Sequence, residues 1–151
     1  MDTDHPTHVV TCFLLRHDRG HDQILLVRRS DRVRTYRGRW AAVSGYLEPE
    51  VTPEAQAYTE IREETSLDAA DVTLMRAGVP LPVEDGAAGL AWVVHPFLFR
   101  VHTPERVHTD WEAHAAQWVA PADLATFDTV PGLAAALAQV YDGKQAPDGT
   151  L

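Results

Sequence analysis

The stretch GYLEPEVTPEAQAYTEIREETSL, residues 45–67, contains a glycine turn followed by a well-marked helix start. Thr52 is a typical N-cap residue, and Pro53 suits the first helical position because the N–H that it lacks would have no helical partner there. Glu54 adds a negative charge to the first turn, where the helix dipole favours it. The sequence therefore predicts a helix from about residue 52 to residue 66.

Three glutamates of this predicted helix share one face. Glu60, Glu63 and Glu64 lie at positions i, i+3 and i+4. Like charges at this spacing destabilise a helix by a few tenths of a kcal/mol per pair. Magnesium and manganese bind carboxylate oxygens, and magnesium often shares its other positions with water and substrate phosphates. Taken alone, the segment EIREE is better explained as a solvated acidic face.

Strands and helices alternate along the rest of the chain. Segments rich in β-branched and apolar residues predict strands, and the polar turn RGHD predicts a hairpin between the first two. The predicted strands are 8–17, 23–29, 40–48, a broken strand over 71–83, 90–102 and a short strand from 116; helices are expected to start at Pro121 and to span 130–143. Pro96 implies a bulge or an edge position. A mixed sheet packed between helices is the natural arrangement of these elements.

Length and composition restrict the class of protein. A chain of 151 residues suits one domain, with a core over about 8–141 and a loose tail at 144–151. The net charge of −9 disfavours binding to nucleic acid, and no apolar run predicts a membrane span. The N-terminus does not resemble a signal peptide, and the single cysteine, Cys12, is expected to be an inert core residue. We therefore expect a soluble cytoplasmic protein with a small-molecule partner, and a homodimer stays open.

The stretch 45–67 resembles the Nudix box of the MutT-like hydrolases. That motif places a glycine before a loop and a helix that carries the pattern Glu-apolar-any-Glu-Glu. The residues in register with it are Gly45, Glu60, Ile61, Glu63, Glu64 and Leu67. The preceding GRWAAVSG and the later DWEAHAAQWV are also similar to the family, so the resemblance covers roughly residues 8–141. It implies an α/β/α sandwich around a mixed β-sheet.

Three positions depart from the box. Val51 stands where the family has its first glutamate, and Thr59 stands where it has the arginine that pairs with that glutamate. Replacing both partners together can change the free energy of folding very little, because no unpaired charge is left. We interpret the pair as neutral packing in place of a salt bridge; the alternative is a box that has decayed. Ser66 replaces the closing glycine, which costs about 1 kcal/mol in a left-handed position.

The resemblance implies a divalent-metal site for Mg²⁺ or Mn²⁺. Glu60, Glu63 and Glu64 would hold the ion together with the backbone carbonyl of Gly45. Glu63 or Glu112 would accept a proton from the attacking water, with Asp110 as a competitor of Glu112 in the same loop; for both of these loop residues an exposed carboxylate is an equally good interpretation. Glu48 is expected beside the substrate or metal, or as an ordinary loop acid.

Six arginines gather within residues 28–39 and predict a site for a small anionic ligand. Arg28, Arg37 and Arg39 are the expected phosphate-binding members, because guanidinium groups can hold phosphate bidentately. Arg28 and Arg29 alternate at a strand end, so only one of them should face the site. Tyr36 and Trp92 are candidates for stacking on a base, although aromatic residues lie more often in a core.

The resemblance implies a metal-dependent hydrolase that cleaves a diphosphate linkage in a nucleoside diphosphate derivative. A non-catalytic nucleotide-binding or sensor domain is the alternative, which the three box departures favour and the three intact glutamates oppose. An isomerase of prenyl diphosphates would need a cysteine facing the diphosphate, and Cys12 in an early apolar strand is a poor candidate. The substrate itself depends on loops that carry no readable code.

Overall fold

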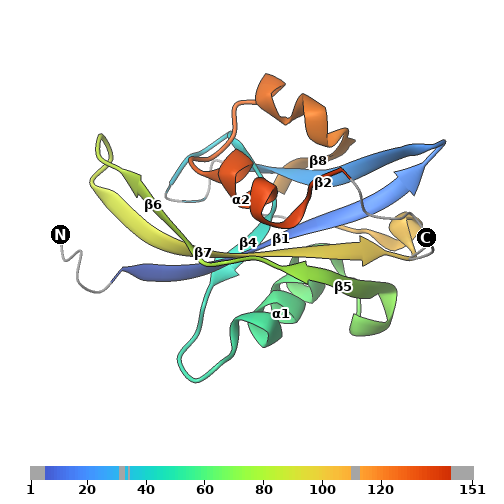
Figure 1. Ribbon diagram of the computed structural model, residues 1–151, viewed down its shortest axis with the longest axis horizontal. Coiled ribbons are helices and arrows are strands. Elements are labelled where there is room, and N and C mark those ends of the chain that lie inside the picture. Colours follow the sequence, from blue (N-terminus) through green and yellow to red (C-terminus); the bar gives the residue numbers. More distant parts are fainter. Residues whose placement is uncertain (1–5, 31–32, 34, 110–112, 144–151) are drawn as a thin grey trace.

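The computed structural model describes residues 6–30, 33, 35–109 and 113–143 of the chain. Within them, an eight-stranded mixed sheet separates helix α1 from helix α2, so that the layers are helix, sheet and helix (Figure 1). The bounds are β1 Thr7–Asp18, β2 His21–Arg29, β3 Trp40–Ala41, β4 Val43–Tyr46, α1 Pro53–Thr65, β5 Val72–Ala77, β6 Leu81–Asp85, β7 Leu90–Val101, β8 Ala113–Val119 and α2 Leu133–Val140, with 3₁₀ turns η1 Ala69–Asp71, η2 Pro104–Arg106 and η3 Pro121–Thr126. The predicted α/β/α sandwich is confirmed.

Strand β1 organises the sheet because its neighbour changes along its length. One edge runs parallel to β7, from Thr7 opposite Trp92 to Leu15 opposite Arg100. The other edge pairs antiparallel with β4 in its first half and with β2 in its second half. Strand β4, which pairs with the first half of β1, leads directly into the turn before α1.

Alternation along the strands builds two cores, one on each face of the sheet. In β1, Val10, Cys12 and Leu14 pack in the cluster that includes Ala57 and Ile61 of α1. Their neighbours Phe13 and Leu15 pack instead in the cluster that includes the buried residues of α2. Successive side chains of a strand point to opposite faces, so both sides of this strand must be apolar.

Helix α1 has the caps that its sequence predicts. Thr52 Oγ1 accepts a hydrogen bond from the Ala55 N–H at 3.1 Å, and Pro53 is the first helical residue. Ser66 closes the helix in the left-handed region, with φ 66° and its N–H bonded to the Arg62 carbonyl. This is the backbone conformation for which the family uses glycine, so the serine is accommodated with some strain.

Three expected elements differ in detail from the structure. Residues 40–48 form two short strands, β3 and β4, because β3 pairs with β2 whereas β4 pairs with β1. The last helix is shorter than expected and starts at Leu133, since Gly132 has φ 82° and is not helical. Pro96 lies in an interior strand, between the stretch of β7 that pairs with β6 and the stretch that pairs with β5. Its missing N–H therefore falls in a gap between the two ladders.

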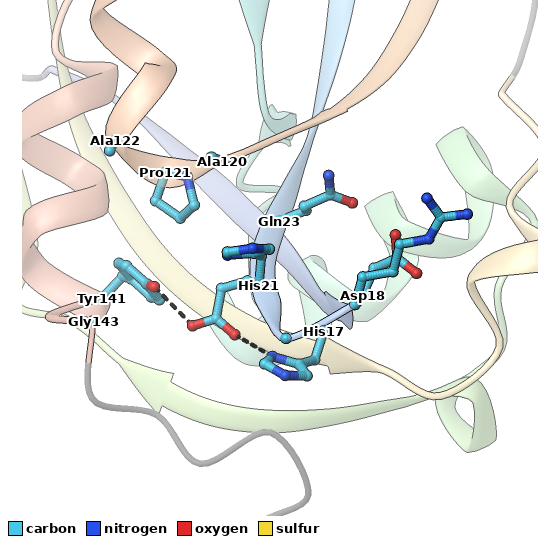
Figure 2. A pocket seen from close by; sticks show the side chains of 12 residues that line it. His17, Asp18, His21, Gln23, Ala120, Pro121, Ala122, Tyr141 and Gly143 are labelled. Atoms are coloured by element: carbon cyan, nitrogen blue, oxygen red, sulfur yellow. Dashed lines mark hydrogen bonds and ion pairs between the residues drawn. The ribbon is translucent and has the colours of Figure 1, made fainter.

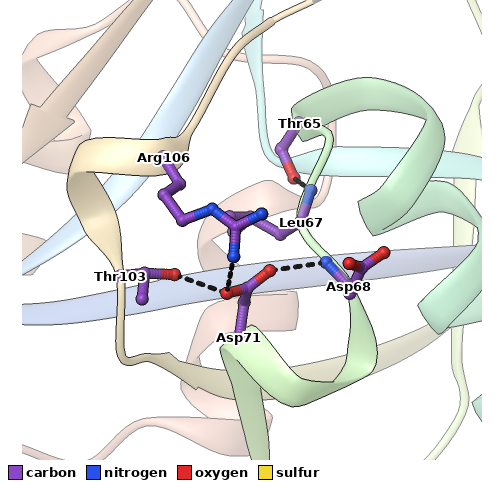
Figure 3. Close-up of polar contacts among 6 residues, drawn as sticks. All are labelled: Thr65, Leu67, Asp68, Asp71, Thr103 and Arg106. Carbon is purple, nitrogen blue, oxygen red and sulfur yellow. Dashed lines mark hydrogen bonds and ion pairs between the residues drawn. The ribbon is translucent and has the colours of Figure 1, made fainter.

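A buried carboxylate anchors the segment that follows β7. Asp71 is 4% exposed and accepts hydrogen bonds from the Asp68 N–H, the Thr103 hydroxyl and the Arg106 guanidinium (Figure 3). The His108 N–H also donates to the Thr65 carbonyl at the end of α1. Residues 103–108 are thus held against both η1 and α1.

Among the described residues, no helix is long and apolar enough to cross a membrane.

Candidate active site

A cavity of about 750 Å³ opens between the first half of β1, β4 and the two helices. Its acidic lining consists of Glu48 from the turn before α1 and Glu60, Glu63 and Glu64 from α1, and Gly45 of β4 lies beside them. The structure therefore brings together the four described carboxylates and the glycine that were singled out from the sequence. The elements responsible are β4, which delivers Gly45 to the sheet edge, and α1, whose helical spacing places the three glutamates on one side.

Glu60 approaches the backbone of β4 very closely. A Cβ atom built on Gly45 would overlap the Glu60 carboxyl group, so no larger residue fits at position 45 unless Glu60 moves. Here glycine is required for close approach rather than for an unusual φ angle, since the φ of Gly45 is not positive. This contact fixes where the half-buried carboxylate lies relative to the sheet.

The electrostatics of the acidic lining favour a cation. Burial raises the pKa of the Glu60 carboxyl; hydrogen bonds with Gln56 and Glu64 oppose this shift, and the charges of Glu63 and Glu48 add to it.

Burial also raises the pKa of the Cys12 thiol well above its ordinary value, with smaller effects from Glu64 and Glu60. The expectation of an inert, buried Cys12 agrees with this environment.

The donors present suit a hard divalent ion. Carboxylate oxygens, together with a backbone carbonyl, are the ligands that magnesium and manganese take. Among the described residues, no group of three or more His, Cys, Asp or Glu side chains lies close enough together to hold a metal ion as it stands. The residues fit the ion in chemistry and in shared location.

Of the arginine segment, Arg29 lines the cavity, whereas Arg28, Arg37 and Arg39 do not. Arg29 donates from Nε to the Thr35 carbonyl at 2.9 Å and from Nη2 to the Thr35 hydroxyl at 3.2 Å. Arg28 donates to the Gly38 carbonyl. The pairing of β2 with β8 shifts register between Arg28 and Arg29, and such irregularities redirect side chains.

The other two expected arginines have partners within or near their own loop. Arg37 Nε donates to the Val33 carbonyl at 2.6 Å. Arg39 lies over the Tyr36 ring, 5.4 Å from its centroid, and 3.8 Å from an Asp128 carboxylate oxygen. Both therefore contribute to the conformation of the loop that carries Tyr36.

Two aromatic residues line the cavity together with the glutamates. Tyr36 and Trp92 have ring centroids 6.1 Å apart, and the Tyr36 hydroxyl donates to Asp85 at 2.8 Å. Burial and this hydrogen bond raise the pKa of Tyr36 to about 12. The phenol thus stays protonated at neutral pH and holds the ring in place at the cavity wall.

Several sequence expectations fall on parts of the chain outside the described residues. Asp110 and Glu112 belong to that set, as do Arg32, Arg34 and the tail 144–151. One residue beside the glutamates was missed from the sequence: Gln56, which is 2% exposed and donates to Glu60. Its signal was its position four residues before Glu60, which puts both side chains on the same helix face.

A second hollow, of about 920 Å³, lies at the β1–β2 hairpin and has a different lining (Figure 2). Asp22 is one of its lining residues; its carboxylate lies 3.0 Å from His17 Nδ1 and accepts from the Tyr141 hydroxyl at 2.8 Å. These contacts tie the end of α2 to the hairpin. None of the box glutamates lines this hollow, so we place the candidate active site in the acidic cavity.

Comparison with known proteins identifies the family. The family described as NUDIX domain matches residues 5–140. A comparison with curated protein sequences finds no significant match. Solved structures with a similar fold include the C. elegans Ap4A hydrolase in a binary complex, at 18% identity and TM-score 0.74, covering 88% of this chain and 93% of that one.

Two further structures agree in fold. The MutT protein from Methanosarcina mazei Go1 has 21% identity and TM-score 0.66, with 87% of this chain and 90% of that one covered. The NUDIX domain of Shewanella oneidensis NrtR, complexed with ADP ribose, has 13% identity and TM-score 0.69, with 92% and 90% covered. Fold and family match lead to one conclusion: the chain belongs to the NUDIX domain family.

Proposed function

We propose that the chain hydrolyses a diphosphate linkage in a nucleoside diphosphate derivative with the help of Mg²⁺ or Mn²⁺. The observation that carries this proposal is the shared cavity: Glu60, Glu63 and Glu64 line the same space as Tyr36 and Trp92. Carboxylates suit a metal-bound diphosphate, and paired aromatic rings suit a planar base. A volume of about 750 Å³ is ample for a small-molecule ligand.

Glu60, Glu63 and Glu64, with the carbonyl of Gly45, are the proposed metal ligands. A divalent cation at such a site neutralises phosphate charge and lowers the pKa of an attacking water. Glu63 is exposed on the cavity side of α1, so it can accept the proton that this water releases. Glu112 remains the other proposed proton acceptor, on sequence grounds alone.

The phosphate farther from the reaction is proposed to contact the arginine segment. Among the described arginines of this segment, Arg29 lines the cavity, and its guanidinium is oriented by Thr35. An oriented guanidinium can hold phosphate oxygens with good geometry. Glu48, also in the lining, is proposed to lie beside the metal-bound part of the substrate.

The structural relatives support the substrate class. Ap4A hydrolase is named for a dinucleotide, and the NrtR domain is complexed with ADP ribose, which is a nucleoside diphosphate derivative. At identities of 13–18% these structures share the fold with this chain. They therefore guide the choice of compounds to screen and do not assign one.

A product screen tests the proposal. Purified protein is incubated with nucleoside triphosphates, dinucleotides, nucleotide sugars and simple nucleoside diphosphates, each with Mg²⁺, with Mn²⁺ and with EDTA. Release of a nucleoside monophosphate or of phosphate products that requires the cation supports the proposal. Cation-independent release of the same products contradicts the metal role. Tight ligand binding without any turnover would favour the nucleotide-binding or sensor alternative, to which Val51 and Thr59 point.

A further inference from the structure

Gln56 is a buried polar residue on the inner side of α1, with an exposed fraction of 2%. Its side-chain amide has a partner at each end. Nε2 donates to Glu60 Oε2 at 2.9 Å, and Oε1 accepts from the Glu48 backbone N–H at 3.1 Å. A backbone N–H can only donate, so the amide oxygen must face Glu48 and the amide nitrogen must face Glu60.

This amide joins two parts of the site that are separate in the chain. Glu48 lies in the turn before α1, and Glu60 lies two turns into the helix, four residues after Gln56. The bond to Glu60 restricts rotation of the carboxylate that packs against Gly45. The bond to Glu48 holds the turn against the helix. Both bonds act on residues that line the acidic cavity.

The neutral side chains of Val51 and Thr59 form no side-chain hydrogen bond that the structure records between the turn and α1. Thr59 donates its hydroxyl to the Ala55 carbonyl, within its own helix. Val51 has no polar side chain, and its backbone N–H bonds to the Glu48 carbonyl inside the turn. Gln56 supplies a side-chain hydrogen bond between the helix and the turn, because its Oε1 accepts from the Glu48 backbone N–H.

We propose that Gln56 is a positioning residue for the metal site. Gln56 takes the place of the missing charged pair at positions 51 and 59 and links the turn to the helix. The inference rests on the proposed function, because it assigns to Gln56 the task of orienting Glu60 for a divalent cation. Groups that hydrogen-bond a ligating carboxylate commonly change metal affinity by about 10–100-fold when they are removed.

Two substitutions separate the two bonds. Gln56→Met keeps the length of the side chain and removes both hydrogen bonds. Gln56→Glu keeps an oxygen that can accept from the Glu48 N–H, but it replaces the donor to Glu60 with a second negative charge. Gln139→Met is the matched control, because Gln139 is a helical glutamine on the exposed face of α2.

The test measures Mn²⁺ binding directly, from the loss of the free-ion signal in electron paramagnetic resonance, on protein shown to be folded by circular dichroism. We expect Gln56→Met and Gln56→Glu to bind Mn²⁺ about 10–100-fold more weakly than the wild type, and Gln139→Met to bind as the wild type does. We also expect kcat to fall more than KM rises, since the substrate-binding arginine and aromatic residues are untouched.

Rescue distinguishes positioning from general destabilisation. Introducing Val51→Glu and Thr59→Arg into Gln56→Met restores a charged link between turn and helix, so Mn²⁺ affinity should recover by about 10-fold or more. If Gln56→Met does not fold, the comparison uses Gln56→Glu with the same pair. Wild-type protein that binds no Mn²⁺ would overturn the proposed function itself. Wild-type binding with unchanged affinity in the folded Gln56 variants, or no rescue by the charged pair, would overturn the role of Gln56 alone.

Discussion

The carboxyl group of Glu60 occupies the space in which the side chain of any larger residue at position 45 would begin. Gly45 of β4 and Glu60 of α1 therefore pack closely only because residue 45 has no side chain. The contact joins β4 to α1 at the edge of the acidic cavity. Its consequence is that the position of one proposed metal ligand depends on the absence of a Cβ atom fifteen residues earlier in the chain.

Gly45→Ala should therefore lower turnover strongly while changing the melting temperature only a little. Alanine is allowed by the backbone, and the flexible Glu60 side chain can move away, so the melting temperature should change by only a few degrees. Turnover should fall by about 10²-fold, because the displaced carboxylate no longer holds the cation. Gly86→Ala is the control, since nothing lies within 4 Å of the added atom there. Equal turnover in the two variants would contradict the role of this contact.

Glu63→Gln and Glu64→Gln should each lower turnover by about 10²-fold or more at saturating Mg²⁺, with the fold retained. The amide keeps the shape of the side chain but removes the charge that binds the cation. Steady-state kinetics on the best substrate of the screen provides the measurement. Glu54→Gln, in the exposed first turn of the same helix, should behave as the wild type. Near wild-type turnover in either site variant would exclude that residue from the metal site.

Divalent cations should raise the melting temperature. Only the folded chain gathers Glu60, Glu63 and Glu64, so binding stabilises it by mass action. At a cation concentration about 100 times the dissociation constant, the gain is about 2.7 kcal/mol, or about 5–10 °C for a chain of this size. Glu60→Gln should reduce this rise in a calorimetric titration. A melting curve that is indifferent to millimolar Mg²⁺ and Mn²⁺ would count against a metal site here.

The pair Val51 and Thr59 can be tested by a double-mutant cycle. Thr59→Arg alone introduces an unpaired guanidinium, and Val51→Glu alone adds a carboxylate close to the acidic lining, so each should destabilise the protein. The two charges can pair, and the double variant should recover part of the loss, with a coupling of about 0.5–3 kcal/mol in the free energy of unfolding. Chemical unfolding in magnesium buffer measures all four proteins. Additivity within about 0.5 kcal/mol would instead support a decayed box.

Asp71 should make stability depend on acid pH. The Asp68 N–H, the Thr103 hydroxyl and Arg106 hold the pKa of Asp71 below its ordinary value. In the unfolded chain this pKa is about 3.9, so the ionised carboxylate stabilises the folded protein above that pH. The contribution is lost as the pH falls through the lower pKa of the folded state.

Asp71→Asn should accordingly melt below the wild type at pH 7, and the difference between them should shrink as the pH is lowered from about 5 to 3. The matched control is Asp123→Asn, because Asp123 is exposed at the start of η3. This control should melt close to the wild type at pH 7. A difference between Asp71→Asn and the wild type that stays constant down to pH 3 would show that the charge of Asp71 does not stabilise the fold.

Local sequence patterns determined the elements of this protein and the composition of its acidic helix face. Thr52 and Pro53 mark where α1 begins, and helical spacing alone puts Glu60, Glu63 and Glu64 on one side. The nearly continuous apolar run of β1 likewise predicts a strand, and the structure buries it on both faces. Such features depend on residues within a few positions of one another, so the sequence carries them without knowledge of the rest of the chain.

The tertiary structure decided which residues meet across the sheet and the turns. Arg29, rather than Arg28, lines the cavity, and the pairing of β2 with β8, a strand some ninety residues farther along the chain, shifts register between these two residues. Gln56 meets the Glu48 backbone only because the turn folds back on the helix. Pairing register and close packing depend on distant segments that compete for the same space, and a local pattern cannot encode that competition.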